Sequence, residues 1–136
     1  MVLCTSPEYL REHGTPTHPA ELSAHAIMAY TPLSMGEVWE FSGSEGAVSV
    51  KVSPNMRSNN GDTCCAAALA HRGIVLQPSF LVAQHIASGA LVEVLSPYRS
   101  HEFAVYAVYP SCRHVTPKVR LLVDFLIDTF RNCSWD

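Results

Sequence analysis

Residues 56–76, with the sequence MRSNNGDTCCAAALAHRGIVL, decide the fold class of this chain. Met56–Ser58 is typical of a short strand, and it leads into a predicted helix, Asp62–His71, whose many alanines allow close packing. Gly73 is expected to end that helix, because a glycine just beyond a helix readily adopts the left-handed conformation. Ile74–Leu76 then forms the next strand. This strand–helix–strand order is typical of α/β domains.

The alternation continues outward on both sides of this segment. Ser6 is a good N-cap and Pro7 suits the first helical position, so Pro7–His13 is predicted to be a helix that Gly14 closes. The remaining expected elements are the strands Met1–Cys4, Ala26–Tyr30, Glu37–Ser42, Ala47–Val52 and Phe103–Tyr109, a helical turn Pro19–Ser23, an extended stretch Leu91–Leu95, and helices from Pro78 to about Ser88 and from Pro117 to about Phe130.

Two of these segments shape the architecture further. Glu37–Ser42 and Ala47–Val52 are separated by four turn residues and should form an antiparallel hairpin. Phe103–Tyr109 is a nearly continuous apolar run, as in a strand that is buried on both faces. We therefore predict one α/β domain over residues 1–136, with three layers, a mixed sheet and a C-terminal helix.

Composition limits the functions that the chain can have. It is 48% hydrophobic and 15% charged, as in a globular protein, and its net charge is −3. The nine Lys and Arg residues are scattered, so DNA binding through this chain alone is not expected. No apolar run approaches the ~20 residues that cross a bilayer, and no membrane partner is expected.

The thiols and imidazoles give no sign of a metal or cofactor. The five cysteines form no CxxC pair, and small reduced thiols in a cytoplasmic protein are the expected state. The seven histidines form neither an HExxH motif nor an i,i+4 pair. We expect no metal and no cofactor.

An ordered set of short motifs resembles the effector-binding domain of LysR-type transcriptional regulators. Each motif is weak alone, but their order across more than a hundred residues is specific. One position departs from the family, which usually has a glycine two residues before Gly73, where this chain has His71. The motifs are Cys4–Leu10, Trp39-Glu40-Phe41, Ser58–Asp62, Gly73-Ile74-Val75 and Val105–Pro110.

The resemblance implies a fold like that of periplasmic binding proteins, with two α/β subdomains joined by crossing strands. Residues 1–5 resemble the first crossing strand, and the region around Pro110 resembles the return. The chain would then be the second subdomain plus the returning helix, and a first subdomain and a DNA-binding winged helix-turn-helix would lie upstream of Met1. DNA would be contacted only through that domain. The apolar face of the 117–130 helix would lack its usual neighbour, so self-association is expected.

Three segments are candidates for a ligand site, because each lies where a strand ends and most lie where a helix begins. The resemblance implies that they form one wall of an effector cleft, and that the effector is a small carboxylate or an aromatic acid. The asparagines and the serine could equally act only as helix caps. The candidate residues are Thr31, Pro32, Asn59, Asn60, Gly61, Asp62, Pro78 and Ser79.

Three functions are compatible with the sequence. The first is a cytoplasmic effector-sensing domain of a transcription regulator, which carries out no chemistry. The second is one lobe of a transporter's solute-binding protein, which has the same two-subdomain plan. The third is an enzyme with Cys64 as nucleophile, because a helix N-terminus lowers the pKa of a thiol, although no histidine is placed by sequence to activate it.

Overall fold

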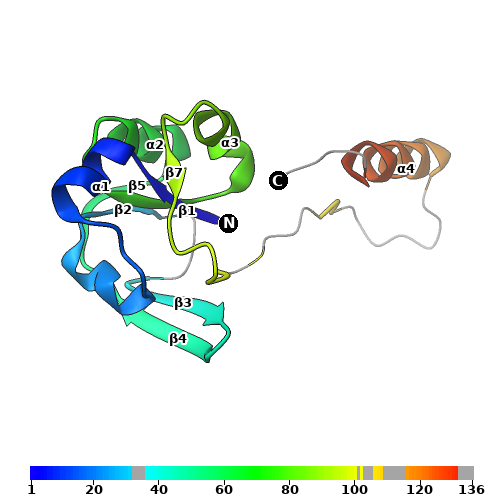
Figure 1. The fold of residues 1–136 in the computed structure, drawn as a ribbon. Helices are drawn as coiled ribbons and strands as arrows, with labels where there is room; N and C mark the ends of the chain where they lie inside the picture. The colour runs from blue at the N-terminus through cyan, green and yellow to red at the C-terminus, as the bar shows by residue number, and fades with distance from the viewer. Residues whose placement is uncertain (32–35, 101, 103–105, 109–115, 132–136) are drawn as a thin grey trace. The chain divides into compact units, whose positions relative to one another are not determined.

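The computed structural model describes residues 1–31, 36–100, 102, 106–108 and 116–131 (Figure 1). The chain divides into two compact units, Met1–Phe103 and Ala104–Asp136, and each is described here by itself.

The first unit contains a five-stranded mixed sheet with the order β5-β2-β6-β1-β7. Strand β2 pairs in parallel with both β5 and β6, whereas β1 pairs antiparallel with both β6 and β7. The mixed α/β sheet predicted from the sequence is therefore confirmed. The strands are β1 (Val2–Thr5), β2 (Ile27–Tyr30), β5 (Pro54–Ser58), β6 (Ile74–Gln77) and β7 (Val92–Glu93).

Helical segments and a hairpin cover the two faces of this sheet. Helices α2 (Gly61–Leu69) and α3 (Ser79–Ala87) lie together in Figure 1 and cover one face. Helix α1 (Pro7–His13), the 3₁₀ helix η1 (Pro19–Ala24) and the hairpin supply side chains to the core on the other face. This arrangement gives the three layers that the sequence predicts.

Alternating side chains along the strands divide the core in two. In β6, Ile74 and Leu76 join one buried cluster and Val75 joins the other. Successive strand residues point to opposite faces, so this split is the direct consequence of a sheet that is covered on both sides. The α2 face is built from small side chains, Cys64, Cys65 and Ala68, which let the helix approach the sheet closely.

The hairpin forms as expected from strands β3 (Val38–Gly43) and β4 (Gly46–Lys51). Gly43 pairs with Gly46, which leaves a two-residue turn between the strands. Trp39 and Phe41 point inward along β3 and are buried in the core, whereas their neighbours are exposed. The inner face of the hairpin thus completes one layer of the first unit.

The end of α2 differs from the sequence prediction. His71, rather than Gly73, takes the left-handed conformation that ends the helix, with φ 62°. The N–H groups of His71 and Arg72 bond the carbonyls of Ala68 and Ala67, at 3.0 Å each, which is the Schellman pattern. Gly73 has a different role, because a Cβ at this position would collide with the Ala26 carbonyl.

In the second unit, helix α4 spans Pro117–Arg131, as predicted. The predicted strand Phe103–Tyr109 is wrong for Tyr106, Ala107 and Val108, which form no strand and are exposed, and the rest of that segment lies outside the described residues. An apolar run becomes a strand only where a neighbouring strand accepts its hydrogen bonds, and no described strand pairs with residues 106–108. No helix in the described part of the chain is long and apolar enough to cross a membrane.

Candidate functional site

The candidate site lies along the edge of the sheet that is formed by the carboxyl ends of the parallel strands β5, β2 and β6. These strands are neighbours, so the residues that follow them come together, and the Thr31 N–H donates to the Ser58 carbonyl at 2.8 Å. Helices α2 and α3 begin directly after β5 and β6 at the same edge. We call this region the open edge, defined by residues 30–31, 58–62 and 77–79. Pro32, the remaining candidate, lies outside the described residues.

Asn60 has the capping role that the sequence allowed. Its Oδ1 accepts from the Thr63 N–H at 3.1 Å, so it is the N-cap of α2. Its own N–H donates to Ser58 Oγ at 3.1 Å. Asn59, Asp62 and Thr31 are exposed at the same edge. The capping side chain of Asn60 is therefore occupied, whereas its exposed neighbours are open to solvent.

Gly61, the first residue of α2, is buried where three elements converge. A Cβ there would lie 2.6 Å from Leu81 Cδ1, 3.1 Å from Gln77 Oε1 and 3.9 Å from Tyr30 Cε2. These neighbours come from α3, β6 and β2 respectively. Glycine therefore leaves room at the α2 N-terminus for the ends of these three side chains.

The start of α3 lacks the side-chain cap that α2 has. Pro78 is its N-cap residue and offers no side-chain acceptor, and Ser79 is the first helical residue. The first N–H groups of a helix have no acceptor within the helix and carry the positive end of its dipole. Pro78 and Ser79 are both partly exposed. This helix start can therefore receive an acceptor from a ligand.

Tyr30 and Gln77 are the strand-end residues that precede Thr31 and Pro78; they stand in the candidate segments without being among the predicted contact residues, and they also belong to the open edge. Gln77 is fully buried, and neither its Nε2 nor its Oε1 has a hydrogen-bond partner among the residues that the structure describes. A signal was present in the sequence, because Gln77 is the polar end of the otherwise apolar strand Ile74–Gln77. That signal shows only that a polar residue ends the strand. Whether the Gln77 amide has a hydrogen-bond partner depends on the packing of three other elements.

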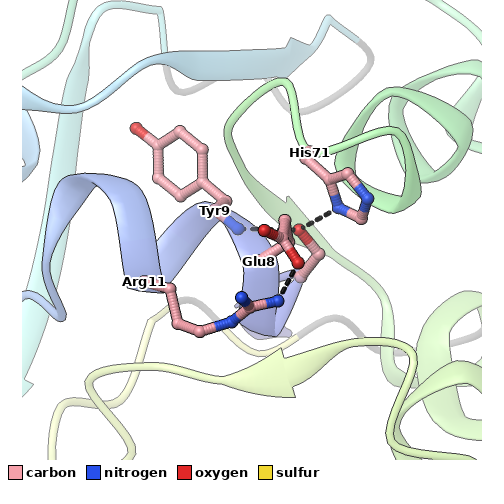
Figure 2. A network of polar contacts seen from close by, with 5 residues as sticks. Glu8, Tyr9, Arg11 and His71 are labelled. Carbon is pink, nitrogen blue, oxygen red and sulfur yellow. Dashed lines mark hydrogen bonds and ion pairs between the residues drawn. The ribbon is translucent and has the colours of Figure 1, made fainter.

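At the opposite edge of the sheet, where β1 ends and α1 begins, polar side chains form a network of contacts (Figure 2). Ser6 Oγ accepts from the Tyr9 N–H at 3.3 Å and bonds His71 Nδ1 at 2.8 Å. Thr5 Oγ1 donates to the Gly73 carbonyl at 2.8 Å. Glu8 and Arg11 form an exposed ion pair on α1. We call this region the closed edge, defined by residues 5–9 and 71–73.

The three cysteines that the structure describes, Cys4, Cys64 and Cys65, do not fit a nucleophile. Cys64 is buried, its Sγ lies 3.7 Å from the Ala29 carbonyl oxygen, and burial raises its pKa. Burial, followed by the neighbouring Cys64 and Asp62, raises the pKa of Cys65 to about 11. Burial is also the main reason that the pKa of Cys4 rises to about 12. These thiols stay protonated and unreactive at neutral pH, so they act as small core side chains.

The first unit is an α/β domain in which three parallel strands end and two helices begin at one edge of the sheet. Residues 1–131 match the family model described as the LysR substrate binding domain. The chain therefore belongs to the LysR substrate-binding domain family, and it is an effector-binding regulatory domain of the LysR type, a non-enzymatic class.

Individual relatives agree with this assignment. The chain is 36% identical over 130 residues to the HTH-type transcriptional regulator DmlR of Escherichia coli (strain K12), covering 95% of this chain and 42% of DmlR. The full-length structure of the Vibrio cholerae virulence activator AphB matches with a TM-score of 0.80 and 32% identity, over 94% of this chain and 44% of that one. The CrgA regulatory domain of Neisseria meningitidis matches with a TM-score of 0.70 and 29% identity, covering 94% and 63%.

The chain thus spans less than half the length of DmlR and AphB. The family assignment replaces the two alternatives that the sequence left open, the lobe of a transporter's solute-binding protein and the Cys64 enzyme.

Proposed function

We propose that the protein binds a small-molecule effector at the open edge, and that binding modulates transcription. The observation that carries this proposal is the convergence of three parallel strand ends and two helix N-termini at one edge of the sheet. Ligands of open α/β sheets bind at such edges, where unpaired N–H groups point outward. The proposed contact residues are Thr31, Pro32, Asn59, Asn60, Gly61, Asp62, Pro78 and Ser79.

The proposed effector is a small carboxylate or an aromatic acid. The helix starts at Gly61 and Ser79 attract negative charge through the positive ends of their dipoles. Tyr30 is partly exposed beside Gly61 and offers an aromatic surface. An acid group next to an apolar or aromatic body matches this combination.

The proposed mechanism needs parts beyond residues 1–136. We propose that the effector lies between this subdomain and a partner subdomain, and that closure around it repositions a helix-turn-helix domain of the kind that the names of the HTH-type relatives describe. Such a switch requires that the effector bind one arrangement more tightly than the other. DNA contact would lie entirely with that N-terminal domain, and the protein would act in the cytoplasm.

Self-association is part of the same proposal. Leu121, Leu122 and Phe125 on α4 are 70%, 57% and 65% exposed, and large apolar side chains clustered on a helix usually contact another chain. The proposed occupant is a second copy of this protein. Sedimentation velocity on the protein and on Leu122→Lys tests this, and an oligomer that the variant leaves unchanged would contradict it.

A ligand screen tests the effector proposal. We expect at least one acid from a panel of carboxylates and aromatic acids to raise the thermal unfolding midpoint, and calorimetry then gives its Kd. Ser79→Ala removes a hydroxyl at the open edge and should weaken that binding by about three- to tenfold.

Ser88→Ala is the matched control, because Ser88 lies at the other end of α3 and its hydroxyl donates to the His85 carbonyl. It should leave Kd unchanged. A panel in which no compound binds, or a ligand that Ser79→Ala and Ser88→Ala affect equally, would contradict a site at the open edge.

A further inference from the structure

Gln77 carries an unexplained polar group in the middle of the open edge. Its side chain is fully buried, yet neither polar atom has a hydrogen-bond partner among the described residues. Buried amides in native proteins are almost always paired, and leaving one unpaired is unfavourable. A leucine in this strand position would avoid that cost, as Leu76 does next to it. The amide therefore calls for an explanation other than packing.

The position of the Gln77 amide indicates the site to which it belongs. Gln77 is the last residue of β6, and its Oε1 lies 3.1 Å from where a Cβ of Gly61 would be, at the first turn of α2. Helix α3 starts two residues later without a side-chain cap. Two helix starts and one unpaired carboxamide thus lie at the same place in the sheet.

We propose that Gln77 determines the specificity of the effector site, and that the effector is a hydroxycarboxylic acid whose hydroxyl group pairs with the Gln77 carboxamide. This inference rests on the proposed function, because the carboxylate part of the effector is assigned there. The hydroxyl part comes from Gln77 alone.

The hydrogen-bond donor and acceptor of the Gln77 amide explain why the proposed effector carries a hydroxyl group. Oε1 is an acceptor and needs a donor, which an ionised carboxylate cannot supply. A hydroxyl next to the carboxylate donates to Oε1, while a ligand oxygen accepts from Nε2. An ammonium group would also donate, but the positive ends of the α2 and α3 dipoles disfavour a cation. A hydroxyl beside a carboxylate therefore satisfies both atoms of Gln77 and the two helix starts.

The covering side chains give a route to the amide. Tyr30 and Leu81, which lie with Gln77 around Gly61, are both only partly buried. Rotation of the Leu81 side chain uncovers the first turn of α2 without moving the backbone. Gln77 has three rotatable side-chain bonds and can then reach outward. The effector therefore reaches the amide by displacing side chains, and the sheet keeps its position.

Matched pairs of acids that differ only by a hydroxyl test this inference in the protein. The probes are lactate and propionate, mandelate and phenylacetate, and 2-hydroxyglutarate and glutarate, with Kd measured by calorimetry. We expect the hydroxy acid of at least one pair to bind about tenfold more tightly than its partner, because the analogue leaves the amide unpaired. This preference is read on the wild-type protein and needs no variant.

Gln77→Met assigns the preference to the amide, because methionine keeps the length of the side chain and removes its polar atoms. The preference should fall to about twofold or less, and the variant should unfold at the same or a higher temperature. Gln84→Met is the matched control, since Gln84 is exposed on α3, and it should keep the full preference. Equal binding within every pair, or a preference that survives in Gln77→Met, would overturn the inference.

The outcomes separate the two proposals. If compounds without a hydroxyl bind best and Ser79→Ala weakens them, the open edge is an effector site and only the inference about Gln77 fails. If every ligand binds equally to the protein and to Ser79→Ala, the effector site lies elsewhere and both proposals fail.

Discussion

The two edges of the five-stranded sheet differ in how their polar groups are paired. At the closed edge, Ser6 caps α1 and bonds His71, and Thr5 bonds the Gly73 carbonyl. At the open edge, α3 begins without a side-chain cap, and the buried Gln77 amide has no hydrogen-bond partner within the described part of the chain. Strands β1 and β6 are antiparallel neighbours, so their helices start at opposite edges of one sheet.

The contrast separates structural from functional polar groups. The same local plan, a strand that leads into a helix, is used at both edges. At the closed edge the chain satisfies its own hydrogen bonds, and the result is stability. At the open edge the Gln77 amide is left unpaired among the described residues, at some cost in stability, and we propose that it serves another molecule.

The largest effect is expected from removing the cap at the closed edge. Ser6→Ala deletes the N-cap of α1 and leaves the His71 ring without its partner, so the free energy of unfolding should fall by about 1–2 kcal/mol. Ser79→Ala at the open edge should change it by less than about 0.5 kcal/mol. Urea unfolding of both variants measures the difference. Equal losses of unfolding free energy in the two variants would show that Ser6 stabilises its helix start no more than Ser79 does.

Variants of His71 test the account of the closed edge further, because this residue combines a strained backbone with a closed-edge hydrogen bond. His71→Ala keeps φ near 62° but loses the bond to Ser6, so it should destabilise the protein by about 1 kcal/mol. His71→Gly also loses the bond but relieves the strain, so it should be close to the wild type. Urea unfolding compares the two. A glycine variant less stable than the alanine variant would contradict the strain.

The third prediction concerns pH and the buried Tyr9, whose hydroxyl lies 3.2 Å from His25 Nδ1 and accepts from the Ala26 N–H. Burial, followed by the nearby His13, lowers the pKa of His25, whereas Glu21 acts in the opposite direction. Because the folded protein binds this proton less readily than the unfolded chain, stability should decrease as the pH falls below about 6.5.

His25→Gln removes the titrating group, so this variant should lose less stability between pH 8 and pH 5 than the wild type does. Urea unfolding at the two pH values measures the loss. Identical losses in both proteins would mean that other groups cause the pH dependence.

The smallest effect is expected from the exposed Asp62, which lies in the first turn of α2. Its negative charge opposes a bound carboxylate, although solvent screens it. Asp62→Asn should therefore tighten carboxylate binding by about two- to threefold at low salt, with less effect at high salt. Asp124→Asn on α4 is the matched control, and it should leave Kd unchanged. Weaker binding by Asp62→Asn would contradict this charge repulsion and indicate that the Asp62 carboxylate accepts a hydrogen bond from the effector.

Local signals predicted most of the fold. Ser6-Pro7 and Gly14 bound α1 as expected, and Asn60 caps α2. These predictions succeeded because helix ends depend on a few consecutive residues. The candidate residues that the structure describes lie at one sheet edge for the same reason, since each follows a strand that could be recognised. Whether they bind an effector stays a prediction.

The features that the sequence did not predict depend on distant contacts. The lack of a partner for Gln77 follows from the packing of Gly61, Tyr30 and Leu81, which come from three other elements. The side chain of the left-handed His71 bonds Ser6, 65 positions earlier in the chain. Strand formation by the apolar residues 106–108 would likewise require a neighbouring strand, which no local pattern reveals.

The most direct test is a nuclear magnetic resonance titration of the isotope-labelled protein with the acid that binds best in the calorimetric panel. The account predicts that the backbone N–H signals of Gly61 and Ser79 and the side-chain amide of Gln77 move together with one Kd, while those of Ser6 and His71 stay in place. Shifts centred on the closed edge, or a Gln77 amide that does not respond at saturation, would contradict it.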